Sequence, residues 1–117
     1  MQDYELDAWL GDTNLTAEQR TRVRAEAVDI EGRYPDEDDD RDERQAALSA
    51  AVAYVLGEVT PLHAGGILTR RRIEAAEALA AARQVARMAA QDGTPKARAA
   101  REAAIDRMTL LKDLGER

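Results

Sequence analysis

Four residues near the carboxyl end have side chains that could contact the bases of double-stranded DNA. The pattern places them on the outward side of one short helix: Arg107, Met108, Leu111 and Lys112. Arg107 can donate two hydrogen bonds to the O6 and N7 atoms of guanine, the commonest specific pairing. Met108 and Leu111 can contact thymine methyl groups, and Lys112 can contact a base or a phosphate. These residues predict sequence-specific DNA binding.

Two short helices joined by a tight corner must position these side chains. Ala100 provides the small residue that the first helix needs where it crosses the second. Four residues later such a corner usually has Gly, and Ala104 in its place predicts backbone strain or a slightly different corner. Asp106 can cap the second helix, and Leu110 and Leu114, spaced i and i+4, give that helix its buried side. The pattern is that of a helix-turn-helix.

The first helix of this pair supplies further candidate contacts. Thr94-Pro95 is typical of a helix start, where backbone N–H groups favour an anion. The predicted DNA-binding residues here are Thr94, Lys96, Arg98 and Arg101, of which the first three would hold phosphates. Glu102 and Asp113 depart from the pattern, because they put negative charge near the expected phosphates.

The segment from about Leu79 to Arg117 resembles the helix-turn-helix regulators of bacteria and their phages, particularly the small homeodomain-like kind. The stretch from Ile105 to Leu110 is similar to the corner and the start of the recognition helix in that superfamily. The resemblance covers about a third of the chain. It implies a trihelical core completed by the helix that ends near Val85 and Met88, and a transcriptional regulator whose last helix enters the major groove.

A helical pattern that begins at Thr60-Pro61 continues to about Gln91. About 30 residues at about 1.5 Å each would span roughly 45 Å, and Gly65-Gly66 is the point where the helix could be interrupted. Short partners in the same chain cannot cover so long a helix, so we interpret it as a connector and dimerisation element, and expect a homodimer that binds two half-sites. The expected buried positions are Leu68, Ile73, Ala76, Leu79, Ala80, Val85 and Met88.

Three shorter helices are predicted in the first 59 residues, which makes the chain all-α. The first runs from Asp3 to Leu10 and stops at Gly11, with Tyr4, Ala8 and Trp9 expected to be buried. The second starts at a Thr16/Gln19 capping box, buries Val23, Ala27 and Ile30, and ends at Tyr34-Pro35. The third runs from about Asp39 to Leu56, with an apolar stripe of Ala47, Leu48, Ala51, Val52, Val55 and Leu56.

Charge divides the chain into an acidic region, 1–59, and a region 60–117 that holds the long helix and the helix-turn-helix. Up to Pro61 there are 16 acidic and 6 basic residues, and from Leu62 onward 7 acidic and 11 basic residues. The acidic run from Asp36 to Glu43 does not fit a calcium-binding loop, because Arg41 and Ala47 occupy the positions of the required Gly and Glu. We expect this region to supply the dimer contact or to bind a protein partner.

Composition excludes several classes of function. The chain has no Cys, and its single His, His63, cannot by itself form a nucleophilic relay or a zinc site. We therefore expect no enzyme activity, no cofactor and no metal. No apolar run approaches membrane-spanning length and the first residues are acidic, which predicts a cytoplasmic protein without membrane contact. The alternative to DNA binding is a helical protein-interaction module, such as a phage-type adaptor or inhibitor.

Overall fold

The computed structural model describes residues 2–116, and within them the chain is all-α with six helices and no strand. The chain forms two compact units, Met1–Ala64 and Gly65–Arg117. The division falls inside the long helix α4 (Pro61–Gln91), a few residues after the boundary expected from charge. No described helix is long and apolar enough to cross a membrane.

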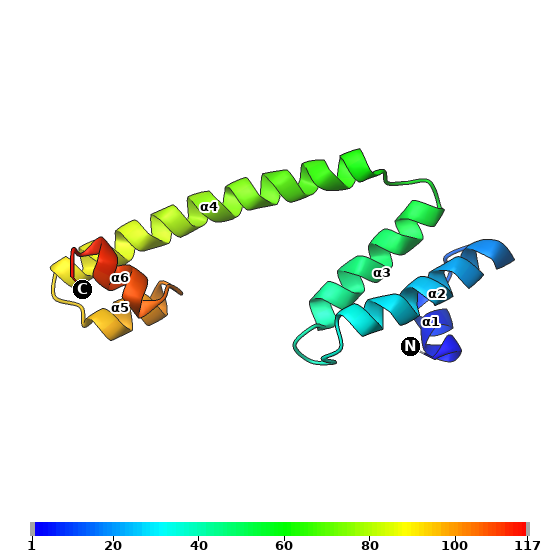
Figure 1. Cartoon of the computed structure of the whole chain (residues 1–117), viewed down its shortest axis with the longest axis horizontal. Coiled ribbons are helices and arrows are strands. Elements are labelled where there is room, and N and C mark those ends of the chain that lie inside the picture. Colours follow the sequence, from blue (N-terminus) through cyan, green and yellow to red (C-terminus); the bar gives the residue numbers. More distant parts are fainter. Residues whose placement is uncertain (1, 117) are drawn as a thin grey trace. The chain divides into compact units, whose positions relative to one another are not determined.

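The first unit packs a short helix against a helical hairpin (Figure 1). Its helices are α1 (Asp3–Leu10), α2 (Ala17–Arg33) and α3 (Arg41–Val55). The predicted Thr16/Gln19 capping box starts α2, and Gly11 follows α1 with a φ of 55°. The Gln19 side chain also donates to the carbonyl of Val55 at 3.1 Å, which ties the start of α2 to the end of α3. The buried core comprises Leu6, Leu10, Val23, Ala27, Ile30, Leu48 and Val52.

The residues of α1 expected to be buried are not the ones that face this core. Tyr4 is 71% exposed, Trp9 is 37% exposed and Ala8 is also exposed. Leu6 and Leu10 are buried instead, one turn apart and on the side opposite to Tyr4 and Ala8. Tyr4 and Ala8 are also one turn apart, so the prediction chose the wrong side of the helix.

Helix α4 (Pro61–Gln91) is continuous for 31 residues. Gly65 and Gly66 do not interrupt it, since the residues on both sides keep their helical pattern. The Thr60 hydroxyl accepts the N–H of His63 at 3.2 Å, so Thr60 caps α4 at the predicted Thr60-Pro61 start, and His63 lies exposed in the first turn.

The buried positions predicted along α4 were wrong. Leu68, Ile73, Leu79, Val85 and Met88 are all between 48% and 64% exposed, and Ala76 and Ala80 are exposed too. Ala86 is the one buried residue that α4 contributes to the described core. Apolar spacing shows which side of a helix prefers burial, but burial also needs a second element to cover that side.

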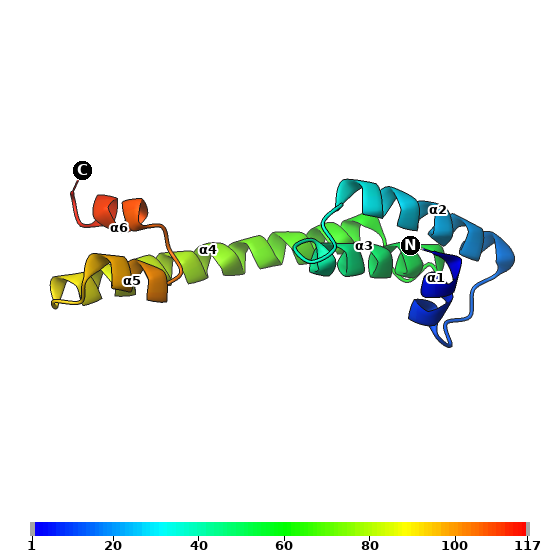
Figure 2. The ribbon, with the colours of Figure 1, turned by 90° about the horizontal axis from the view of Figure 1, so that it is seen from below.

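The second unit folds two short helices beside the end of α4 (Figure 2). These are α5 (Lys96–Glu102) and α6 (Arg107–Asp113), separated by the four residues 103–106. Asp106 caps α6 as predicted, because its carboxylate accepts the N–H of Met108 at 3.0 Å. The core joins all three helices and comprises Ala86, Ala99, Ala100 and Leu110.

The corner after α5 closes with two hydrogen bonds of the Schellman type. The N–H of Ala104 donates to the carbonyl of Arg101 at 3.1 Å, and the N–H of Ile105 donates to that of Ala100 at 3.0 Å. Helices α3, α4 and α6 end in the same pattern, with Gly at the left-handed residue: Gly57, Gly93 and Gly115. Ala104 takes that conformation with a φ of 58°, so the strain predicted at this corner is present.

Replacing Ala104 by Gly should therefore stabilise the second unit. An L-residue in the left-handed region costs about 1–2 kcal/mol, and the greater freedom of Gly in the unfolded chain returns about 0.4–1 kcal/mol of that. Ala104 is exposed, so no packing is lost. We expect the free energy of unfolding to rise by about 0.5–1 kcal/mol. Urea unfolding followed by the amide resonances of α6 measures it.

Ala97→Gly is the matched control, because Ala97 is exposed and helical in the same short helix. This variant should lose about 1 kcal/mol of stability. Destabilisation by Ala104→Gly of similar size would contradict the assignment of strain to the corner.

Candidate nucleic-acid interface

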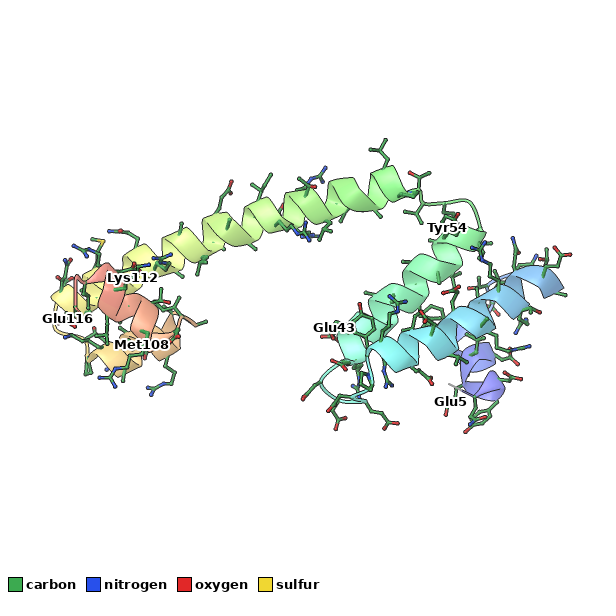
Figure 3. All side chains as sticks on the ribbon, viewed as in Figure 1. Glu5, Glu43, Tyr54, Met108, Lys112 and Glu116 are labelled. Carbon is green, nitrogen blue, oxygen red and sulfur yellow. The ribbon has the colours of Figure 1, made fainter. Side chains whose placement is uncertain are left out.

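Helix α6 has one side held by the unit and one side free. Leu110 is fully buried against Ala86 and the two core alanines of α5, and Asp113 is half-buried. On the other side Met108 is 62% exposed, and Arg107 and Lys112 are exposed as well. Figure 3 shows Met108 and Lys112 on this helix. Three of the four predicted base-contacting side chains are therefore exposed, whereas Leu111 is half-buried.

An ion pair fixes α6 on α4. The guanidinium of Arg83 binds the carboxylate of Asp113 through two parallel hydrogen bonds, Nε to Oδ2 at 2.9 Å and Nη2 to Oδ1 at 2.6 Å. Arg87, one turn along α4, donates to the backbone carbonyl of Asp113. The side chain of Asp113 is only 17% exposed. Because a two-pronged contact permits few orientations, this clamp sets the rotation of α6.

The same hydrogen bonds shift the titration of Asp113. The Arg83 side chain lowers the pKa of the Asp113 carboxyl below its ordinary value, more strongly than desolvation raises it. The negative charge at the end of α6 is therefore neutralised within the unit. From the sequence we expected the negative charge of Asp113 to oppose phosphate binding. In the structure Asp113 instead positions the helix.

Two of the five predicted cations are already paired with carboxylates. Lys96 binds Glu116, with Nζ at 2.6 Å from Oε2, and Arg98 binds Glu102 with Nε at 3.0 Å from Oε1. In the part of the chain that the structure describes, no ion pair engages Arg101, Arg107 or Lys112. All three are exposed, so they are the cations of this region that are free to meet an anion.

Thr94 does not begin α5. The residue that precedes this helix is Pro95, which makes no side-chain capping bond. The N–H of Thr94 instead donates to the carbonyl of Ala89 at 2.9 Å and closes the end of α4. Thr94 therefore belongs to the turn after Gly93, and the helix predicted to start at Thr94-Pro95 begins at Lys96.

The acidic run after α2 forms a turn that leads into α3. The carboxylate of Asp36 accepts the N–H groups of Asp38 and Asp39 at 2.9 and 2.7 Å, and these two bonds lower the pKa of Asp36. Asp40 in turn accepts the N–H of Asp36 at 3.0 Å. Among the described residues no group of three or more His, Asp or Glu side chains could hold a metal ion.

No protein-family model, curated protein or solved structure matches the chain. The resemblance to helix-turn-helix regulators is therefore supported by its own motif residues alone.

Sequence reasoning missed the clamp between Arg83 and Asp113 and the partner of Lys96. Residues 83 and 113 lie 30 positions apart, and nothing in the local pattern of either links them. An indirect signal was present, because an Asp in the last turn of a helix is unfavourable unless a cation lies beside it, and α4 offers Arg83 and Arg87 one turn apart.

The clamp should make the stability of the second unit depend on pH. The pKa of the Asp113 carboxyl is lower in the folded unit than in the unfolded chain. Asp113 therefore stabilises the fold above its ordinary pKa and loses this effect as the pH falls through the lowered pKa. Asp113→Asn should therefore unfold more easily than the parent above about pH 5, and the difference should close at lower pH.

The second unit contains no aromatic residue, so the measurement follows the Leu110 amide resonance during heating at a series of pH values. Asp92→Asn, at an exposed turn residue of the same unit, is the control and should track the parent. An Asp113→Asn midpoint equal to the parent's at neutral pH would show that the clamp contributes nothing to folding.

Proposed function

We propose that the chain binds double-stranded DNA through the free side of α6 and acts as a transcriptional regulator. The observation that carries the proposal is the division of α6 into a clamped side and a free side. Leu110 and Asp113 hold the helix, which leaves Arg107, Met108 and Lys112 exposed around its outer surface. An exposed helix that begins with an unpaired Arg is suited to the major groove, which accommodates one α-helix.

The roles of the side chains follow from their chemistry. Arg107 stands in the first turn of α6, where side chains of a recognition helix meet base edges, and would contact guanine. Met108 would contact a thymine methyl group, and Lys112 a base or phosphate. Arg101 on α5 would contact the phosphate backbone, which positions the protein without specifying sequence.

A second candidate is a protein-interaction module. The observation that favours it is the apolar side chain of Met108 on α6, which is 62% exposed. Ionic strength separates the two, because neutralised phosphates release counterions and DNA affinity falls steeply with salt, whereas apolar contacts depend on salt much less.

Selection of binding sites from random duplexes tests the proposal of DNA binding directly. Recovery of one shared sequence supports it, and a pool that stays random at low salt overturns it.

Two substitutions on α6 should affect DNA binding differently. Arg107→Ala should weaken binding by about 1–3 kcal/mol and relax the preference at one base pair. Lys112→Ala, if it removes a phosphate contact, should weaken all duplexes alike and reduce the slope of log affinity against log salt by about 1. Fluorescence anisotropy on the selected site measures both. Arg41→Ala, an exposed cation of the first unit, is the control, and equal losses for Arg41 and Arg107 would remove Arg107 from the interface.

Removing the carboxylate that neutralises Arg98 should strengthen DNA binding. In Glu102→Gln the guanidinium of Arg98 loses its partner and becomes available to a phosphate. Since exposed ion pairs are worth about 0.2–1 kcal/mol, we expect DNA affinity to rise by about 1.4- to fivefold at low salt. Glu18→Gln makes the same change of net charge on α2 and controls for it. Equal effects of the two variants would mean that Arg98 lies outside the interface.

A further inference from the structure

The free part of α4 is a surface to which the proposed function gives no role. Every residue from 65 to 81 is exposed. Ile67, Leu68, Ile73 and Leu79 are large apolar side chains within this stretch, each between 46% and 55% exposed. Helices in proteins gain most of their stability from packing rather than from propensity. A partner for this stretch is therefore expected.

We propose that two copies of the chain pair in parallel through one side of α4. This side carries Gly66, Thr69, Ile73, Ala76 and Ala80, five residues that we call the Ile73 seam. Their spacing alternates between three and four residues, which is the spacing at the contact of a two-stranded coiled coil. The residues around Ile73 are small, so two helices can approach closely along the seam.

Charges on the two flanks of the seam identify the partner as a second copy. Arg72 lies on one flank and Glu77 on the other, five residues further on. In a parallel pair these are the positions that face each other across the contact, so Arg72 of each copy meets Glu77 of the second copy, twice by symmetry.

The ion pairs within the chain leave both of these groups available. No ion pair among the described residues engages Arg72 or Glu77, whereas Arg71 is paired with Glu74 at 3.4 Å. Arg72 and Glu77 cannot pair with each other on one helix, because residues five apart point in directions about 140° different. A second chain would pair both charges.

Orientation follows from the residue at the centre of the seam. In a parallel pair Ile73 packs against Ile73 of the second copy, and a β-branched residue at this position favours two parallel strands. An antiparallel pair would instead oppose Ile73 to Ala76 and Arg70 to Glu77. The stripe through Leu68 and Leu79 is a poorer contact, since Arg72 lies between them on the same side.

The seam is also compatible with the rest of the unit. It stops before Arg83 and Arg87, whose side chains are engaged with Asp113, so pairing leaves the clamp intact. Parallel pairing would place both copies of α6 at the same end of the paired helices, as two half-sites require. That consequence rests on the proposed function, whereas the pairing itself is tested without DNA.

Charge variants test the contact by sedimentation equilibrium of the full chain. Arg72→Glu and Glu77→Arg should each raise the dissociation constant of the dimer about tenfold, because each variant replaces two attractions by two repulsions. The double variant R72E/E77R should return it to the parent value. Restoration by R70E/E77R instead would indicate antiparallel pairing. A parent chain that stays monomeric over a 100-fold range of protein concentration, up to that used for NMR spectroscopy, would overturn the proposal.

Cross-linking tests the orientation independently. The chain has no Cys, so Ile73→Cys should form a covalent dimer under mild oxidation, because residue 73 meets itself only in the parallel pair. Ala78→Cys, exposed on the opposite side of α4, is the matched control and should remain largely uncross-linked. Equal cross-linking at positions 73 and 78 would overturn the seam. A parent chain that dimerises as expected but does not bind DNA would instead count against the proposed function alone.

Discussion

The arrangement of the second unit depends on close contact between helices that meet through alanines. Ala86, Ala99 and Ala100 supply three of the four buried residues, and Leu110 is the one large side chain among them. Small side chains let three helices approach closely, but they bury little apolar area, and stabilisation scales with the area removed from water. Such a core brings the helices together and leaves their orientation weakly determined, so directional contacts have to supply the orientation.

Two directional contacts do this at opposite ends of α6. At its start Asp106 caps the helix, and the Schellman bonds before it give the chain its turn at the cost of a left-handed Ala104. At its end Asp113 is clamped by Arg83 and Arg87. The free side of α6, on which the proposed DNA contact depends, is therefore a consequence of polar contacts made by its other side. The strain at Ala104 is tolerated because both hydrogen bonds of the corner form.

Helix α4 differs from the short helices, because its central part exposes large apolar side chains that no other element covers. The same helix contributes Ala86, Arg83 and Arg87 to the core and clamp near its end, and exposed Ile73 and unpaired Arg72 earlier along its length. A second copy that covers Ile73 would use the part of α4 that the unit leaves open. The proposed pairing and the proposed DNA contact would then occupy separate parts of one unit.

Local signals in the sequence determined the starts of three helices. The Thr16/Gln19 capping box, the Thr60-Pro61 start and the Asp106 cap all act within four residues, and each is confirmed. Burial and ion pairing were decided by the tertiary structure, as the exposed Trp9 and Ile73 and the Arg83–Asp113 clamp show. The physical reason is range: capping bonds join neighbours in the chain, whereas burial and ion pairs depend on which distant element covers a side.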